Sequence, residues 1–276
     1  MENLIRGFKE KPTFRFTTLL VLLLILIVIL APVISPYNPL EAVMKDANQA
    51  PSAAHLFGTD KLGRDVLSRI LYGGAYSLTS VLALVAIIFC VGTTMGVLAG
   101  YYGGMVDTVI MRIADMMISF PGVILAIAIA GVMGGSLINA MIALTVVTWT
   151  KYARLARSVV LKIKKRDFVD AAIVSGGTST HILIAHILPN IIPVLIVTAV
   201  SDIGAMMMEL AGLSFLGFGS QPPAPEWGLM LNEGRQQLQT APWLMFFPGL
   251  AIFLTVVVFN LWGDALRDVL DPRDED

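Results

Sequence analysis

The chain has 276 residues, of which 56% are hydrophobic and only 14% are charged, and its formal net charge is −1. A water-soluble protein of this size could not bury so much apolar surface, so the composition predicts an integral membrane protein surrounded by lipid. The near-zero net charge provides no general attraction to nucleic acid. The single cysteine excludes an internal disulfide.

The first apolar segment follows a basic N-terminus. Arg6, Lys9, Lys11 and Arg15 precede an uninterrupted apolar run at 16–34. The core of a cleaved signal peptide has only about 7–15 residues, whereas a bilayer span needs about 20. We therefore predict a retained first transmembrane helix at 16–34.

The polar segment 36–74 is predicted to be a loop that contains a short helix of its own. Thr59 or Asp60 could cap this helix, because both side chains can accept a hydrogen bond from the first turn. Asp60 and Arg64 also have the i,i+4 spacing of an ion pair.

Five further apolar segments complete a predicted all-α protein with six transmembrane helices. They are expected at about 77–100, 109–132, 137–155, 189–213 and 242–262. The segment 109–132 contains Pro121, which removes a backbone hydrogen bond and should kink the helix. Arg112 and Asp115 in the same segment are three residues apart, so they should lie on one helical face.

The positions of Lys and Arg predict the orientation in the membrane. With the N-terminus inside, the inner segments hold fourteen of the 19 basic residues and the outer loops hold five. Cytoplasmic loops carry such an excess. Both termini and the segment 162–189 are therefore predicted to be cytoplasmic.

The segment 162–189 contains residues at the spacing of a known signature. After a basic run that ends at Arg166, these residues are Asp170, Ala171, Ala172, Gly176, Leu188 and Pro189. The pattern resembles the coupling loop of ABC-importer permeases, with Asp170 in place of Glu and His186 in place of Ile. The segments HLFGTDKLGRDVLSRILYGG (55–74), SFLGFG (214–219) and EWG (226–228) also resemble the inner-membrane permeases of dipeptide, oligopeptide and nickel importers. Within this family the chain is most similar to the second, C-type permease subunit.

The resemblance implies a type I ABC importer permease in the inner or plasma membrane of a prokaryote. It implies as partners a second homologous permease, two ATPase subunits and an extracytoplasmic substrate-binding protein. The sequence has no GxxxxGK[ST] loop, so we expect the partners, and not this chain, to hydrolyse ATP. We expect no catalytic residues and no cofactor. We divide the chain into 1–75, with the first span and the outer loop, and a permease core at 76–276.

The proposed coupling loop suggests a mechanism. A short helix at 167–175 would expose an apolar surface of small residues made by Phe168, Val169, Ala171, Ala172 and Val174. Gly176 would let the backbone turn at the end of this helix. Such a helix fits a groove on a separate protein, which the resemblance identifies as the ATPase subunit.

Two acidic residues lie within the predicted fifth span, and both are candidates for the translocation path. Asp202 and Glu209 are seven residues apart, nearly two helical turns, and share a stripe. A charge inside a bilayer usually faces a bundle interior or a water-filled path. For Glu209, path lining and structural pairing are equally favoured, whereas for Asp202 a structural role is favoured and Arg112 is too close to the inner face to be its obvious partner.

The histidines and methionines do not predict a metal site. His181 and His186 are five residues apart, which would place them about 140° apart on an α-helix, and His55 is predicted on the other side of the membrane. Met206–Met208 are consecutive and therefore point in different directions, which favours packing.

The substrate is the least determined property. The residues 202–204, 226–230 and 152–154 look more like those of nickel permeases than of dipeptide permeases, so we favour nickel, free or chelated. Dipeptides or oligopeptides are the alternative. A membrane-embedded enzyme, such as an intramembrane protease, and a passive channel are less favoured. The first would need a paired catalytic constellation, and the second would not use a coupling loop.

Overall fold

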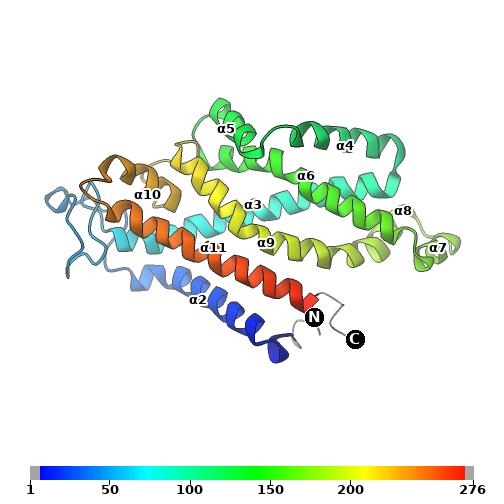
Figure 1. Cartoon of the computed structure of the whole chain (residues 1–276), viewed down its shortest axis with the longest axis horizontal. Helices are drawn as coiled ribbons and strands as arrows, with labels where there is room; N and C mark the ends of the chain where they lie inside the picture. The colour runs from blue at the N-terminus through cyan, green and yellow to red at the C-terminus, as the bar shows by residue number, and fades with distance from the viewer. Residues whose placement is uncertain (1–6, 271–276) are drawn as a thin grey trace.

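The computed structural model describes residues 7–270 and forms an elongated bundle of helices (Figure 1). The helices are α2 (Pro12–Ile34), α3 (Val66–Tyr102), α4 (Gly104–Ile118), α5 (Gly122–Met133), α6 (Leu137–Ile163), α7 (Asp167–Val174), α8 (Ser179–His181), the π-helix η2 (Ile182–Ile187), α9 (Leu188–Phe215), α10 (Trp227–Gly234) and α11 (Trp243–Leu270). Short 3-10 turns lie at Met44–Asp46 and Arg235–Gln237. No β-strand is present between residues 7 and 270, so the predicted all-α class is confirmed.

The described residues contain fewer clear membrane spans than the six predicted. Four helices are long and apolar enough to cross a bilayer: α2, α3, α11 and the continuous helix Ser179–Phe215. The bent pair α4 and α5 would make a fifth if it forms one span. Helix α6 is 27 residues long, but its second half carries Lys151, Arg154, Arg157 and Lys162, which lower its mean hydropathy. The count of six spans therefore stays a prediction.

The sequence predicted one kinked helix at 109–132, but the structure has two separate helices there. Helix α4 ends at Ile118, and α5 begins at Gly122 with its axis turned by 91°. Pro121 is the N-cap of α5, and a proline pushes the residue before it out of the helical region. Asp115 on α4 forms its ion pair with Arg154 of α6, with 2.5 Å between Oδ1 and Nη2.

The helix expected inside 36–74 is the beginning of α3. Its cap is Asp65, whose Oδ2 accepts from the backbone N–H of Ser68 at 2.8 Å, and not Thr59 or Asp60. The Asp60–Arg64 ion pair is present at 2.6 Å between Oδ2 and Nε, but it lies in the preceding turn. Gly63 separates the two residues with a φ of +75°, a left-handed conformation that excludes a helix at this point. The helix then continues through residue 75, where the predicted division of the chain falls.

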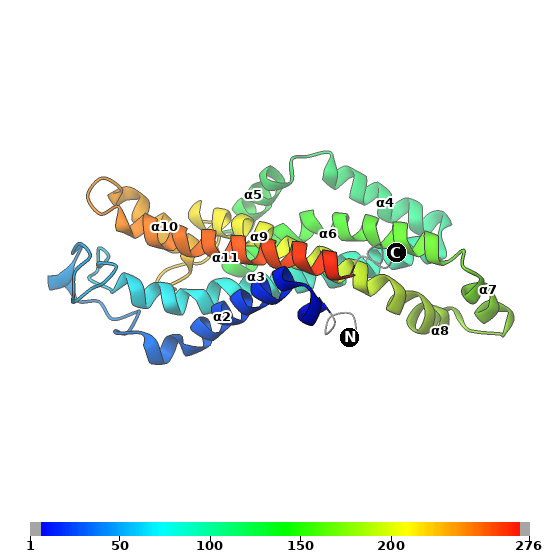
Figure 2. The ribbon, with the colours of Figure 1, turned by 60° about the horizontal axis from the view of Figure 1, so that its bottom comes forward.

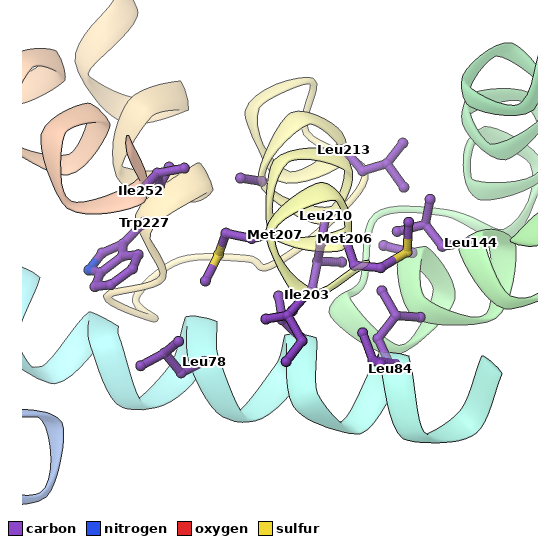
Figure 3. Close-up of a cluster of buried hydrophobic side chains, with 14 of the residues drawn as sticks. Leu78, Leu84, Leu144, Ile203, Met206, Met207, Leu210, Leu213, Trp227 and Ile252 are labelled. Carbon is purple, nitrogen blue, oxygen red and sulfur yellow. The ribbon is translucent and has the colours of Figure 1, made fainter. Parts of the chain in front are cut away.

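Helix α9 lies at the centre of the main hydrophobic core (Figure 3). Its inward side chains pack against α3, α6, α10 and α11. The core residues that Figure 3 labels come from all these helices and are Leu78, Leu84, Leu144, Ile203, Met206, Met207, Leu210, Leu213, Trp227 and Ile252. Met206 and Met207 are buried in this core, whereas Met208 is 57% exposed. The methionine run therefore serves packing and does not converge on one point.

The two ends of the bundle have different chemistry. At the end that carries α10 (Figure 1), the buried Arg69 donates to Asp60 and to Glu233 of α10. Glu226 caps α10, and burial raises the pKa of its carboxyl, while the backbone amides of Gly228 and Leu229 act in the opposite direction. At the other end, the start of α2 meets the end of α11, where Lys11 Nζ donates to the Asp268 carbonyl at 2.6 Å. Helix α7 projects at this second end (Figure 2).

Candidate functional site

The short helix α7 forms where the sequence predicted it. Asp167 and Asp170 occupy its first turn, where negative charge is favourable next to the unpaired N–H groups. At its C-terminus, Gly177 N–H donates to the Ala172 carbonyl at 3.0 Å. Gly176 has a φ of +83° and nothing lies within 4 Å of the position that a Cβ would take. The glycine is therefore required by backbone conformation and not by crowding.

Helix α7 has one face against the protein and one face that is open. Val169 is fully buried, which corrects its predicted place on the partner-facing surface. It packs in a small core with residues of α3, α6, η2 and α9, whose buried members include Val160, Ile182 and Ile187. Asp170 and Ala171 are exposed, and Ala172 is half-buried.

The exposed surface of α7 is mixed, because it carries Asp167, Asp170 and Ala171 as well as three large apolar side chains that are distributed around the helix. The side chains of Phe168, Ile173 and Val174 are 42%, 50% and 88% exposed. Apolar exposure of this kind, on a short helix flanked by charged residues, is typical of a surface that meets another protein. Val169 thus connects α7 to α6, η2 and α9 by packing.

Basic residues before α7 contact other helices of the bundle. Lys164 Nζ donates to the carbonyl of Tyr101, at the end of α3, at 2.6 Å. Arg157 on α6 forms an ion pair with Asp107 on α4 at 2.5 Å between Nε and Oδ1. Lys164 and Arg157 therefore have specific partners within the protein, in addition to their contribution to the charge bias that predicts its orientation.

Leu188 and Pro189 are not at the start of a span after a loop. They lie inside the continuous helix Ser179–Phe215, so the fifth predicted span begins ten residues earlier than expected. The turns before Pro189 are π-helical, and Leu188 N–H donates to the carbonyl of Leu183, five residues back. Since a proline ring clashes with the carbonyl four residues before it, here that of Ala185, a wider turn accommodates Pro189 within the helix.

The π-helix also overturns the predicted separation of two histidines. His181 and His186 do not point 140° apart, because their ring centroids lie 5.6 Å apart with an angle of 81° between the ring planes. A π-helix bonds residue i to residue i+5, and this spacing brings the two imidazoles to the same face. The ring of His186 also lies 6.5 Å from that of Phe168 on α7.

Asp202 has partners on α6. Its Oδ1 and Oδ2 lie 2.6 and 2.9 Å from Lys151 Nζ, and Oδ2 accepts from the hydroxyl of Tyr152 at 2.9 Å. Asp202 is buried, whereas the side chain of Lys151 is 56% exposed. A structural pair was expected for Asp202, but Lys151 and Tyr152 were not identified as its partners. The available signal was their position at the boundary between the apolar and basic halves of α6.

Glu209 lies two turns further along α9 and is half-buried. Among residues 7–270 it forms no ion pair. The structure thus places Asp202, and not Glu209, in a charged pair with a lysine of α6. No set of three or more His, Cys, Asp or Glu residues that could hold a metal ion occurs in the described part of the chain.

Comparison with known proteins gives two family matches. Residues 92–274 match the binding-protein-dependent transport system inner membrane component. Residues 2–51 match the N-terminal transmembrane domain of oligopeptide transport permease C.

Several curated proteins are similar over most of their length. The dipeptide transport system permease protein of Alkalihalophilus pseudofirmus is 44% identical over 88% of this chain and 80% of its own length. The glutathione transport system permease protein of Pectobacterium atrosepticum is 46% identical over 82% of this chain and 75% of its own length. The nickel transport system permease protein of Escherichia coli K12 is 44% identical over 86% of both chains.

Among solved structures, the MetNI methionine ABC transporter in inward-facing conformations has a similar fold, with a TM-score of 0.53 at 19% identity. The match covers 71% of this chain and 95% of the other.

Proposed function

We propose a coupling mechanism and a substrate class for this chain, which belongs to the family of inner membrane components of binding-protein-dependent transport systems and is a permease subunit of an ABC importer. In the proposed complex it forms half of the translocation path, beside a second homologous permease. Two ATPase subunits bind on the side of α7, and an extracytoplasmic binding protein delivers the substrate at the end that carries α10. Both termini lie on the cytoplasmic side.

The single observation that carries the coupling proposal is the two-faced packing of α7. Its exposed residues Phe168, Ile173 and Val174 would enter a groove on the ATPase, while Val169 remains buried against the bundle. Movement of the ATPase would then be passed through Val169 to η2 and α9. Transport becomes a population shift between outward-open and inward-open states that the partner drives.

The path proposal rests on Glu209. A half-buried carboxylate without an ion-pair partner among residues 7–270 is costly inside a bilayer unless water or a cation meets it. Asp202 is placed differently, because Lys151 and Tyr152 satisfy its carboxylate. We therefore assign Glu209 to the wall of the path and Asp202 to the joint between α6 and α9.

We propose that the substrate is a solute with a positively charged group. Free Ni²⁺ has such a charge, the charge of chelated nickel depends on the chelator, and a peptide carries a positive charge at its amino terminus. The curated relatives named for nickel and for dipeptides are equally similar to this chain, at 44% identity each, so they favour neither. Uptake of radiolabelled Ni²⁺ and of a labelled dipeptide by the reconstituted importer, each with its binding protein, separates the two.

The experiment that tests coupling compares substitutions of two glycines with positive φ. Gly176→Val and Gly134→Val place the same β-branched side chain at φ values of +83° and +87°, and neither position is crowded. Gly134 also has a ψ of 160°, a region that only glycine readily adopts, so the control is at least as severe a change to the backbone as Gly176→Val. We expect Gly176→Val to abolish ATP-dependent uptake at near-normal protein levels and Gly134→Val, in the turn between α5 and α6, to retain it. Equal uptake by both variants would remove α7 from the mechanism.

A further inference from the structure

We propose that His181 and His186 form a two-histidine binding site for a divalent transition-metal ion at the junction of α8 and η2. This site is separate from the translocation path. The observation that carries it is the π-helix, which brings together two imidazoles that an α-helix would hold apart. π-Helical turns are rare and occur frequently at functional sites.

The ring geometry is close to that of two imidazoles on one metal ion. Metal–nitrogen distances of 2.0–2.1 Å in cis or tetrahedral positions place the two ring centroids about 4.5–5.2 Å apart. The observed separation is 5.6 Å, with the planes nearly perpendicular at 81°. Small rotations of the two side chains would therefore bring one nitrogen of each ring onto a common ion.

The accessibility of the two histidines fits a site that loads from solvent. His181 is exposed and His186 is half-buried, and neither ring is engaged in an ion pair within the described residues. The third histidine differs, because Nδ1 of His55 lies 2.9 Å from Asp65 Oδ1 at the opposite end of the bundle. Neutral imidazole nitrogens are good ligands for Ni²⁺, Cu²⁺ and Zn²⁺, and water would complete the coordination.

The two histidines lie where a bound ion would affect the movement of α7 relative to α9. His181 immediately precedes the π-helix that joins α8 to α9, His186 lies within it, and the ring of His186 lies 6.5 Å from that of Phe168 on α7. An ion bound to both rings would fix the π-helical turn and so restrict movement of α7 relative to α9. That this restriction would slow transport rests on the proposed function, whereas the binding of the ion does not.

The binding test uses the complete importer complex, purified without a polyhistidine tag and titrated with Ni²⁺ alone by isothermal titration calorimetry. We expect His181→Gln and His186→Gln each to weaken one class of binding sites by at least tenfold, since even indirect partners of metal ligands contribute about 10–100-fold. Thr180→Ala, a change at the exposed neighbour on the same turn, is the matched control and should bind as the unchanged complex does. Because His181 is exposed, its substitution should leave the fold intact.

Unchanged Ni²⁺ binding by His181→Gln would overturn the proposal. X-ray absorption of the loaded complex gives a second criterion. In the difference between the spectra of the unchanged complex and the double variant, two imidazole ligands per lost ion support a shared ion, and one or none contradicts it. These results do not depend on uptake, so they stand apart from a failure of the coupling experiment.

Discussion

Lys151 and Asp202 join α6 to α9 through an ion pair of 2.6 Å, although the two residues are 51 positions apart in the chain. The pair is asymmetric, because Asp202 is buried and the side chain of Lys151 is 56% exposed. Tyr152, the neighbour of Lys151, adds a hydrogen bond to the same carboxylate. Two consecutive residues of α6 thus hold one acidic residue of the central helix.

This asymmetry predicts unequal effects of the two single substitutions. Lys151→Met would leave a buried carboxylate with only Tyr152, and breaking a fully buried pair in this way costs about 3–5 kcal/mol. The exposure of Lys151 reduces that cost. Asp202→Asn would leave only an exposed ammonium group, so its cost should be smaller. We expect the thermal aggregation temperature of the detergent-solubilised chain to fall more for Lys151→Met than for Asp202→Asn.

The double variant provides the control. In Lys151→Met combined with Asp202→Asn no charge is left unpaired, so its aggregation temperature should lie close to that of Asp202→Asn alone. Additive losses in the double variant would mean that the pair does not act as a unit.

Two substitutions of Glu209 separate the effect of its charge on uptake from the effect of its packing on assembly. Glu209→Gln keeps the shape and removes the charge, and we expect it to lower uptake several-fold while the complex assembles and binds its ATPases. Glu209→Leu removes the polarity as well, and uptake by both variants is compared with the amount of assembled complex. Normal transport by Glu209→Gln together with failed assembly of Glu209→Leu would identify Glu209 as a structural hydrogen-bonding group instead.

The charge bias predicts the orientation of the chain in the membrane. A reporter inserted near the exposed Asn48, in the loop before α3, should read extracytoplasmic. A reporter fused at Asp276, which lies outside the described residues, should read cytoplasmic. Enzymatic reporters that are active on only one side of the membrane make this measurement. The reverse pair of readings would place α7 where no ATPase could reach it.

The sequence was sufficient for features that depend on local rules. The helix at 167–174 agrees with the short helix expected at 167–175 from the resemblance to a coupling loop, and Gly176 after its end has the expected left-handed conformation. The Asp60–Arg64 pair follows from spacing, although the intervening Gly63 places it in a turn. Apolar length located most of the long helices.

The remaining features depend on contacts that no local pattern encodes. A proline alone is compatible with a modest kink, so Pro121 does not by itself predict the 91° turn between α4 and α5. The ion-pair partner of Asp202 is Lys151, which lies 51 residues away in the chain. The spacing between Asp202 and Glu209 could therefore not predict this pair. The histidine pair was missed because a periodicity of 3.6 residues was assumed where the helix is π-helical.

The central claim is that the open face of α7 contacts an ATPase subunit, and cross-linking from Val174 tests it most directly. Val174→Cys, in a chain with Cys90→Ser, places the only thiol of this chain on the side chain that is 88% exposed. Val132→Cys on α5 is the matched control, at 91% exposure. With a short thiol-to-amine cross-linker in the assembled importer, we predict an adduct between this chain and the ATPase for Val174→Cys and none for Val132→Cys. An ATPase adduct that is absent from Val174→Cys, or equally abundant with Val132→Cys, would contradict the account.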